Sequence, residues 1–378
     1  GLVQTEQEAL TVAKRIGYPV MIKAIAGGGG RGMRAAHNDI SLVKGYHTAR
    51  TEAEKAFGNS GVYIEKFIEN PHHIEFQILG DTRGNIIHLG ERDCSIQRRN
   101  QKVIEEAPSP FLDPETRKAM GEQSVALAQA VGYTSAGTVE FIVDGDRNFY
   151  FLEMNTRLQV EHPVTEVITG IDLVEWQIRV ASGEKLPMTQ KQVAALRNGH
   201  GIEVRINAEN PTAGKFLPSP GTITKLTTPD GFGTRFDGGY EAGDTVSQYY
   251  DNLVGKLIVW GKDRDTAIAR TIRALEEMVI EGVHTTIPAD LAILRHPDFS
   301  AVTHSTKWVE ETLDLSKLVS SAGGGEAPED GLIERSTTVE VNGKRFDVKM
   351  WVPEFTAGVA KKSKKPTRGS GSSGGALA

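Results

Sequence analysis

The sequence predicts an α+β fold, in which a small subdomain with a glycine-rich loop precedes a larger subdomain built on an antiparallel sheet. Three observations support this prediction. Apolar segments with period-two alternation are linked by short Gly, Asp and Asn turns, which is typical of antiparallel hairpins. Segments with helical apolar spacing separate these hairpins. A run of four glycines, residues 27–30, lies between two expected strands near the start of the chain.

The composition is that of a soluble globular protein. The chain has 378 residues, which suggests about two or three domains, and it is 39% hydrophobic and 24% charged. A formal net charge of −6 argues against a broad nucleic-acid-binding surface. The only cysteine, Cys94, rules out an internal disulfide and favours a reducing, cytoplasmic location, and no apolar run is long enough to span a membrane. The first residues already have helical spacing without an initiator methionine, so we expect further sequence upstream.

Residues 1–67 are expected to form the small subdomain. The segment "EQEALTVAKRIG" predicts a helix that ends near Gly17, and "YPVMIKAIA" predicts a buried strand. A second strand follows the glycines, a helix is expected over residues 39–57, and "GVYIEKFI" predicts a third strand. The glycine loop would then lie at the tip of a hairpin.

Residues 68–315 are expected to form the larger subdomain. Strands are predicted in the segments 72–81, 84–97, 137–159 and 200–210, and helices near 113–131, 165–182 and 263–280. A Gly/Pro/Glu-rich linker is expected over 316–334, a β-hairpin around Asn342-Gly343 over 335–352, and a disordered Lys-, Ser- and Gly-rich segment over 353–378.

The glycine loop was compared with two phosphate-binding templates. Gly27-x-Gly29-x-x-Gly32 matches the dinucleotide fingerprint in form, but a strand rather than a helix follows it, and Met33 breaks the P-loop pattern. A flap whose backbone N–H groups close over phosphate remains, with Lys23 on the preceding strand able to neutralise phosphate charge. The alternative is an ordinary flexible surface turn.

A pair of carboxylates marks the hairpin of residues 137–159. Folding this segment about its Asp-Gly turn places Glu140 nearly opposite Glu153. Like charges that face each other destabilise a hairpin, so the pair suggests a bound cation, and oxygen ligands favour Mg²⁺ or Mn²⁺ with substrate phosphates. The alternative is that one glutamate faces solvent or pairs with a lysine.

If this strand continues, its polar face extends through Asn155, Arg157, Gln159 and Glu161. Such a varied polar face does not resemble a core-facing one. Arg157 would bind an anion in bidentate fashion, and Glu161 would act as a base. The alternative is a solvated edge strand with ordinary ion pairs.

Other candidates carry weaker signals. The segment "QRRNQK" contains Arg98, Arg99 and Lys102, and in isolation a solvated basic turn explains it best. Arg205 lies on an alternating strand and is therefore held firmly, although a half-exposed strand would show the same pattern. His72 and His73 are more often structural than ligating as lone histidines, and Cys94 is expected to be a small buried hydrophobe.

Taken together, these motifs resemble the biotin carboxylase component of biotin-dependent carboxylases. The matching segments are "KAIAGGGGRGM", "EKFIENPHHIE", "ERDCSIQRRNQK", "EEAP", "FLEMNTRLQVEHPVTE" and "RINAEN…FLPSPG", in order over residues 1–315. The tail resembles that of an acyl-CoA carboxylase α subunit. The resemblance implies an ATP-grasp fold, in which the two subdomains clasp ATP.

The resemblance also implies a role for each site residue. Contacts to the nucleotide are implied for Lys23, Gly28, Gly29, Gly30, Gly32, Glu65, Lys66, Ile68, His73 and Gln97. The implied metal ligands are Glu140, Glu153 and Asn155. Bicarbonate would be bound by Lys102, Arg157, Gln159 and the backbone of Val160. Glu161 would deprotonate bicarbonate, and Arg205 would stabilise negative charge on the biotin ureido oxygen.

The implied reaction is the first half-reaction of an acetyl- or propionyl-CoA-type carboxylase, as in fatty acid biosynthesis. ATP and Mg²⁺ convert bicarbonate to carboxyphosphate, which delivers CO₂ to biotin on a carrier domain outside these residues. The implied partners are that carrier domain, a carboxyltransferase β subunit and a second copy of the chain, with Phe232 and Arg235 matching the family's dimer surface. Asn100 departs from the family, where many members have histidine.

Two other functions remain open from the sequence. Another ATP-grasp ligase, joining a carboxylate to an amine, would share the carboxylate hairpin and the glycine flap. A non-catalytic assembly component would explain the hairpin tail and an upstream α/β domain lying outside these residues. Lys349-Met350 superficially resembles a biotin attachment site, but its alternation with Trp351 predicts a strand rather than an exposed turn.

Overall fold

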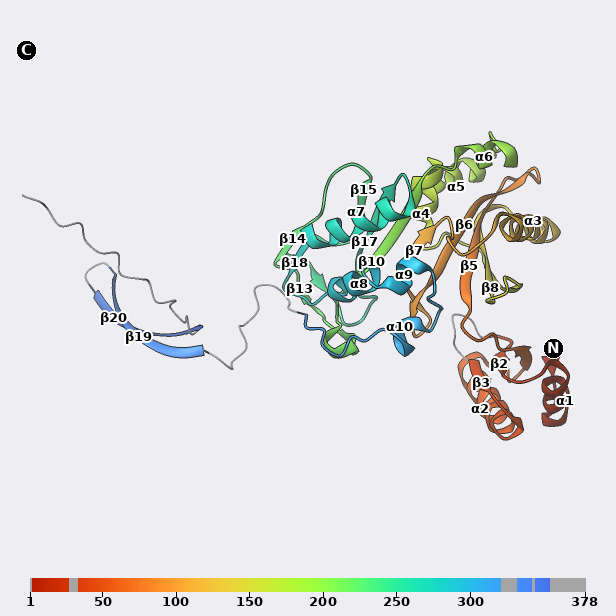
Figure 1. The fold of residues 1–378 in the computed structure, drawn as a ribbon, viewed down its shortest axis with the longest axis horizontal. Helices are drawn as coiled ribbons and strands as arrows, with labels where there is room; N and C mark the ends of the chain where they lie inside the picture. Colours follow the sequence, from red (N-terminus) through yellow and green to blue (C-terminus); the bar gives the residue numbers. More distant parts are fainter. Residues whose placement is uncertain (1, 27–32, 321–331, 342–343, 354–378) are drawn as a thin grey trace, which may run out of the picture. The chain divides into compact units, whose positions relative to one another are not determined.

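The computed structural model describes residues 2–26, 33–320, 332–341 and 344–353 (Figure 1). The chain divides into two compact units, Gly1–Gly323 and Gly324–Ala378. The glycines at 27–32, most of the predicted linker and the segment after residue 353 lie outside the described residues. Of the helices in the described part of the chain, none is long and apolar enough to cross a membrane.

The first elements of the larger unit form a separate four-stranded sheet with its helices, which we call the lid. Its strands form a sheet in the order β1-β4-β2-β3, with two helices packed on it. The bounds are β1 Leu2–Val3, α1 Glu6–Ile16, β2 Val20–Ala24, β3 Met33–Ala36, α2 Asp39–Phe57 and β4 Val62–Lys66. The helix predicted over 39–57 is confirmed at both ends. Asn38 accepts a hydrogen bond from the N–H of Ser41 at 2.9 Å, and Gly58 ends the helix with φ +65°.

The second sheet is large and antiparallel, as predicted. Eight strands follow the order β15-β17-β10-β7-β6-β5-β8-β9. Their bounds are β5 His72–Gly80, β6 Ile86–Arg98, β7 Gln101–Ala107, β8 Ser135–Val143, β9 Phe149–Asn155, β10 His200–Asn207, β15 Thr234–Gly238 and β17 Leu253–Gly261. The helices are α3 Pro114–Ala130, α4 His162–Thr169, α5 Leu173–Ala181, α6 Gln190–Leu196, α7 Arg264–Glu277, α8 Ile287–Leu294, α9 Pro297–Ala301 and α10 Trp308–Glu311.

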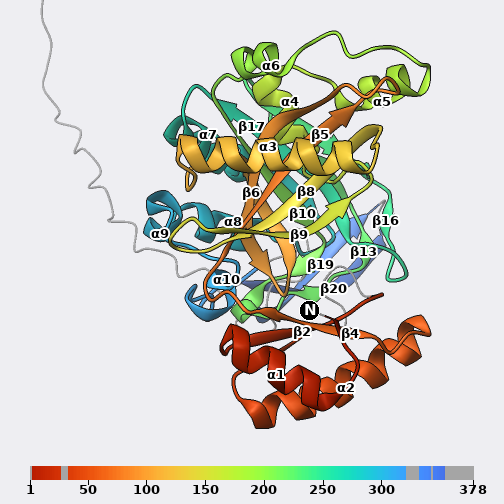
Figure 2. The same ribbon diagram turned by 90° about the vertical axis from the view of Figure 1, so that its right-hand side faces the viewer.

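Helices cover both faces of this sheet, and side-chain parity decides which residues each face receives. On β5, Ile74, Phe76 and Ile78 pack with the apolar residues of α3, which lies across the sheet in Figure 2. The intervening residues, including Glu75 and Gln77, therefore point to the opposite face. On β10, the alternate residues from Ile202 pack with α7, while α4 covers Gly201 on the other face.

Strand β10 decides between the two readings of its alternation. The alternative of a half-exposed strand does not hold, because six of its eight residues are buried and Glu203 has no exposed surface. The physical reason is that β10 is central in the sheet, between β7 and β17, and helices cover both of its faces. Its charged residues are therefore part of an interior.

Short elements complete the larger unit. They are β11 Glu209–Asn210, a 3₁₀ turn at Thr212–Gly214, β12 Leu217–Pro218, β13 Gly221–Thr222, β14 Lys225–Thr227, β16 Thr245–Val246 and β18 Val279–Glu281. They pair as β11–β12, β13–β16 and β14–β18. These pairs extend the main apolar core, which continues through Ile223, Val246 and Ile280.

The second unit contains the predicted hairpin. Strands β19 Leu332–Val341 and β20 Lys344–Pro353 pair antiparallel in continuous register, with Val341 opposite Lys344. The hairpin begins at Leu332 rather than at 335 and ends at 353 rather than 352, because the pairing continues beyond the alternating stretch that predicted it. The Asn342-Gly343 turn itself lies outside the described residues. Lys349 lies within β20, as predicted, opposite Ser336.

Candidate functional site

A cleft of about 1380 Å³ lies where the lid meets the large sheet. Its walls contain nearly every candidate from the described residues. The lid contributes Lys23, Glu65 and Lys66, and the segment that links the lid to the large sheet contributes Ile68. The large sheet and its loops contribute His73, Gln97, Lys102, Glu140, Glu153, Asn155, Arg157, Gln159, Val160, Glu161 and Arg205. The candidate glycines, Gly28, Gly29, Gly30 and Gly32, lie outside the described residues.

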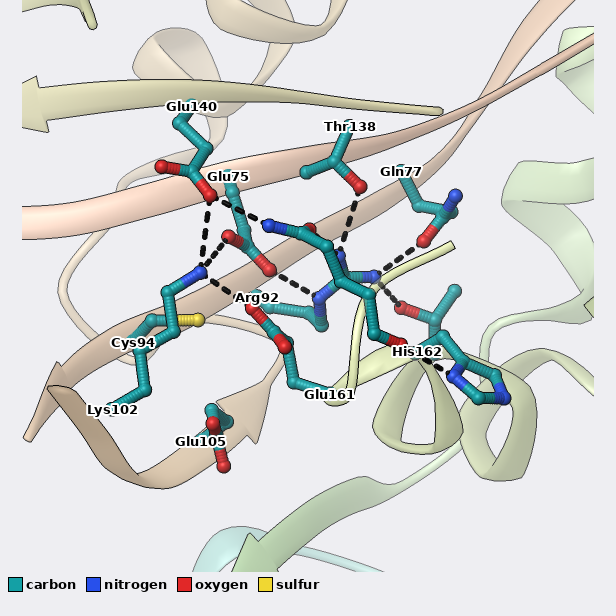
Figure 3. Close-up of polar contacts among 12 residues, drawn as sticks. Glu75, Gln77, Arg92, Cys94, Lys102, Glu105, Thr138, Glu140, Glu161 and His162 are labelled. Atoms are coloured by element: carbon teal, nitrogen blue, oxygen red, sulfur yellow. Dashed lines mark hydrogen bonds and ion pairs between the residues drawn. The ribbon is translucent and has the colours of Figure 1, made fainter. Parts of the chain in front are cut away.

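Lys102 is the centre of the polar contacts in the cleft (Figure 3). Its Nζ donates to Glu75 Oε2 at 2.6 Å, to Glu140 Oε1 at 3.1 Å and to Glu161 Oε1 at 2.5 Å. Burial alone would lower the pKa of Lys102, but these carboxylates outweigh that effect and raise its pKa well above the usual value. Lys102 is therefore a fixed cation.

The turn between β6 and β7 positions Lys102. Arg99 and Asn100 adopt φ +51° and +64°, and the strands leave this turn with Arg98 opposite Gln101 and Gln97 opposite Lys102. The interpretation of "QRRNQK" as a solvated basic turn is thus correct only for its tip. Arg99 is largely exposed, but the side chain of Lys102 is only 12% exposed because its strand parity directs it into the sheet face.

The predicted opposition of Glu140 and Glu153 is confirmed by the β8–β9 register. Glu140 is buried, and its oxygens accept hydrogen bonds from Lys102, Asn155, Gln159 and His73. Despite burial, which acts to raise it, the pKa of Glu140 is lowered because His73 and Lys102 stabilise the carboxylate. The alternative of pairing with a lysine therefore holds for Glu140, while Glu153 is half-buried and lines the cleft.

The expected continuation of β9 is wrong. The strand ends at Asn155, and Glu161 stands at the N-cap of α4. A turn near Leu158 replaces the strand because His162 and Pro163 begin a helix, in which Pro at the first turn is well accommodated. The turn still brings Gln159 and Glu161 into the interior, while Arg157 stays exposed beside Asn155, to which it donates at 3.3 Å.

Arg205 reaches the same end of the cleft from β10. Its Nε donates to Glu105 Oε1 at 2.6 Å, and its Nη2 donates to Glu161 Oε2 at 3.0 Å. Burial acts to lower the pKa of Arg205, but Glu105 and Glu161 raise it overall. The carboxylate of Glu161 thus lies between Lys102 and Arg205, one cation on each oxygen.

Arg92 was missed by the sequence analysis. Its guanidinium is fully buried and donates to Glu75 at 2.6 Å, Gln77 at 2.7 Å, Thr165 at 3.0 Å, Gln159 at 2.9 Å and Thr138 at 3.2 Å (Figure 3). It therefore orients Gln159 and holds Glu75 toward Lys102. The alternation of β5 could have indicated this buried polar group, since Glu75 and Gln77 share the face of the strand that carries His73.

These residues form one continuous group, which we call the charged strip. It consists of Glu75, Arg92, Lys102, Glu105, Glu140, Glu161, Arg205 and Lys256. Lys256 joins it by donating to the carbonyl of Val160 at 2.8 Å. Cys94, as expected, is buried beside the strip, and burial raises the pKa of its thiol.

The lid and the adjoining hinge provide a simpler wall. Lys23 Nζ contacts Glu65 Oε2 at 3.0 Å, and Lys66 donates to the carbonyl of Tyr18 at 2.9 Å. On the opposite wall the side-chain amide of Gln97 donates to His73 Nδ1 at 2.8 Å, so His73 Nε2 carries the proton that it shares with Glu140. Gln97 and His73 are thus fixed in orientation.

Two family models match the chain. One is described as "Carbamoyl-phosphate synthase L chain, ATP binding domain" and matches residues 1–189. The other is described as "Biotin carboxylase C-terminal domain" and matches residues 203–311. The second model begins within β10, and the residues between the two models include α6.

Curated relatives agree with these matches. A biotin carboxylase of Nostoc sp. is 58% identical over 311 residues, covering 82% of this chain and 69% of the relative. A propionyl-CoA carboxylase alpha chain of Ruegeria pomeroyi is 51% identical over 331 residues, covering 82% of this chain and 48% of the relative. A 2-oxoglutarate carboxylase small subunit of Hydrogenobacter thermophilus is 53% identical.

Solved structures share the fold. A biotin carboxylase from Campylobacter jejuni, in a β-γ-ATP complex, superposes with a TM-score of 0.78 at 48% identity, covering 82% of this chain and 68% of that one. The Hydrogenobacter thermophilus biotin carboxylase domain dimer, in complex with MgADP, ADP and bicarbonate, gives a TM-score of 0.78 at 53% identity with the same coverage. The predicted fold class is therefore confirmed.

Proposed function

The chain belongs to the biotin carboxylase family, and from that premise we propose that it is the ATP-grasp ligase that carboxylates biotin with bicarbonate. The observation that carries this proposal is the convergence of Lys102, Glu161 and Arg205 at one end of the cleft. A base held between two cations suits the capture and deprotonation of a small anion. This arrangement favours bicarbonate as the substrate over the alternative of a carboxylate–amine ligase.

Each residue has a defined task in this proposal. Lys102, Arg157, Gln159 and the backbone of Val160 bind bicarbonate, and Glu161 removes its proton. Arg92 fixes the side-chain amide of Gln159, so that bicarbonate meets an oriented hydrogen-bond partner. Arg205 faces the negative charge that develops on the ureido oxygen of biotin, and electrostatic stabilisation of this kind typically contributes about 10²–10³-fold in rate.

The nucleotide is assigned to the other end of the cleft. Lys23 and the glycine loop at Gly28, Gly29, Gly30 and Gly32 would meet its phosphates, and Glu65, Lys66, Ile68, His73 and Gln97 would meet its base and sugar. The lining of the cleft by both subdomains supports a clasped nucleotide. We propose residues 1–67 and 68–315 as the two subdomains of the clasp.

The donor set of the facing strands fits a hard divalent cation. Glu140, Glu153 and Asn155 offer oxygen ligands that line the cleft, and Mg²⁺ prefers such ligands together with phosphate oxygens. When bound there, Mg²⁺ or Mn²⁺ would neutralise phosphate charge during phosphoryl transfer. The hydrogen bonds that Glu140 accepts from Asn155 and Gln159 already hold its carboxylate in place.

The partners follow from the same proposal. Biotin arrives on a carrier domain outside these residues, because Lys349 lies within strand β20 rather than at a turn. The second unit is proposed as a docking element for a partner such as the carboxyltransferase β subunit. The propionyl-CoA carboxylase relative supports an acyl-CoA-type enzyme, and the dimer of the Hydrogenobacter structure supports a homo-oligomer.

The experiment that tests the function is ATP cleavage that depends on both bicarbonate and free biotin. We expect Arg205→Ala to retain ATP binding and to lose biotin-dependent turnover by about 10²–10³-fold. Arg179→Ala is the matched control, since Arg179 lies on the surface of α5, where it contacts Glu175, Glu184 and the ring of Trp176. Biotin-independent activity in the parent protein, or unchanged biotin carboxylation in Arg205→Ala, would contradict the proposal.

A further inference from the structure

A second buried acidic group lies beside the charged strip without a task in the proposed reaction. Glu203 and Glu105 stand directly opposite each other on β10 and β7. Both side chains have no exposed surface. Glu105 uses one oxygen to bind Arg205, but its Oε2 and both oxygens of Glu203 have no hydrogen-bond partner among the described residues.

The surroundings of Glu203 are apolar on one side. Ala107 on β7, Val164 and Ile168 on α4, and Ile258 on β17 form a buried cluster on this face, and Ile258 is the register partner of Glu203. An ionised carboxylate placed there, without a hydrogen bond from the described residues, would carry the desolvation penalty of a buried and unpaired charge. A neutral carboxyl group avoids most of that cost.

The charges around Glu203 lead to the same conclusion. The charged groups that face it are Glu105 on β7, Arg205 on its own strand, Lys256 on β17 and Glu161 at the start of α4. The two cations among them already have partners: Arg205 pairs with Glu105 and Glu161, and Lys256 lies 3.8 Å from Asp237 on β15 and donates to the carbonyl of Val160. An ionised Glu203 would add a further carboxylate next to cations that are already paired.

We propose that Glu203 and Glu105 are a carboxyl–carboxylate pair that holds one proton, and that the neutral Glu203 is a positioning residue that keeps the Arg205 end of the cleft receptive to anions. The inference rests on the proposed function only for the identity of the anion. Burial raises the pKa of Glu203 well above its usual value, and the charge of Glu105 raises it further, which agrees with this arrangement.

The consequence for binding is a loss of anion affinity as the pH rises through the pKa of Glu203. If Glu203 ionises, a new negative charge appears beside Arg205 and competes with an incoming anion for its guanidinium. Glu203→Gln keeps the volume, remains neutral at every pH, and can donate its amide N–H to Oε2 of Glu105. The variant should therefore bind anions above that pKa as the parent does below it.

The first measurement is infrared difference spectroscopy of the carboxyl C=O stretch at pH 7. Glu203→Gln should remove part of the protonated-carboxyl band. The matched control is Asp290→Asn, because Asp290 on α8 is also fully buried, and burial raises the pKa of its carboxyl well above the usual value, so it should contribute a separate part of the band. A band that Glu203→Gln leaves unchanged would overturn the proposal, whether or not the protein turns over ATP.

The second measurement is the affinity for bicarbonate by calorimetry as a function of pH, which does not require turnover. In the parent protein the affinity should fall at least about tenfold as the pH rises through the pKa of Glu203, as expected for one added charge near the site. In Glu203→Gln this loss should disappear, whereas Asp290→Asn should keep it. An alkaline limit that is the same in Glu203→Gln and the parent would overturn the positioning role, even if the infrared band supports the proton.

Discussion

The two walls of the cleft hold their charges in different ways. On the lid, Lys23 forms one ion pair, with Glu65, whose side chain is 43% exposed. The large sheet presents Lys102 and Arg205 within the charged strip, where Lys102 contacts three carboxylates and Arg205 contacts two, and these carboxylates are almost fully buried. A charge on the lid can change partners at little cost, whereas a charge on the sheet is fixed by its neighbours.

This difference fits the tasks that we propose for the walls. A phosphate-binding lid must release its own contacts when the nucleotide arrives, and a single ion pair with a partly exposed carboxylate allows that. A site for bicarbonate and biotin must keep its geometry between turnovers, and a network in a low-dielectric interior maintains it. The comparison can be tested by removing charges from each wall in turn.

The largest effect is expected for Arg92→Gln. The change leaves the buried carboxylate of Glu75 without its arginine partner, and breaking one side of a buried ion pair typically costs about 3–5 kcal/mol of unfolding free energy. Chemical denaturation measures the loss. Arg34→Gln on the lid is the control, since its pair with Glu52 is about half exposed and should contribute less than about 1 kcal/mol. Equal losses in the two variants would contradict the comparison.

The next effect is expected for Glu153→Gln, which separates metal binding from folding. Glu153 is half-buried opposite Glu140, and replacing it by its amide removes repulsion while keeping volume, so the unfolding free energy should stay the same or rise slightly. The Mg²⁺ concentration for half-maximal ATP cleavage should rise by at least about tenfold. ATP cleavage is measured as a function of Mg²⁺ concentration for the parent and for Glu153→Gln. Parent-like activity of the variant at limiting Mg²⁺ would rule out Glu153 as a metal ligand.

Acid should weaken the large sheet before the lid. The pKa values of Glu75, Asp93, Glu106 and Glu140 are lowered in the folded sheet, mainly because cations and hydrogen bonds outweigh the opposing effect of burial. Their stabilisation is therefore present above the unfolded values of about 4 and is lost as the pH falls toward the folded values. Hydrogen exchange at decreasing pH should show β5 and β8 losing protection first. Earlier loss in β2 and β4 would contradict this order.

The smallest effect on stability is expected for Lys23→Met. Its ion pair is partly exposed, so the unfolding free energy should change by less than about 1 kcal/mol. The affinity for ATP should nevertheless fall, because a phosphate partner is lost. Nucleotide titration and thermal unfolding of the same samples separate the two quantities. A variant with weakened folding and unchanged ATP affinity would reverse the proposed role of Lys23.

The sequence predicted the elements of the fold well because they are local. The helix over 39–57, the first helix ending at Gly17, the opposition of Glu140 and Glu153 and the strand of Arg205 all follow from periodicity and turn residues. The alternation of polar residues after Glu153 could not predict where β9 ends. The strand stops before Glu161 because a helix begins directly after that residue.

The contacts of the buried charged residues in the site were harder to predict from the sequence. Arg92 and Glu105 are held by residues from distant segments, such as Thr165, Gln159 and Arg205, so no local pattern indicates their role. Glu203 shares the face of β10 that carries Arg205, but its burial depends on β7, β17 and α4, which only the tertiary structure brings together. The buried charges therefore required the fold before they could be interpreted.

The two-residue turn at Arg99 and Asn100 also limits how this protein can be altered by insertion or deletion. Its left-handed backbone fixes Gln97 opposite Lys102, and the side chains of a strand change faces with every residue. Adding or removing one residue there would send Lys102 to the opposite side of the sheet and leave Glu75, Glu140 and Glu161 facing one another without it. The length of this turn is therefore a stricter requirement than the identity of its exposed side chains, and libraries that vary it should keep two residues.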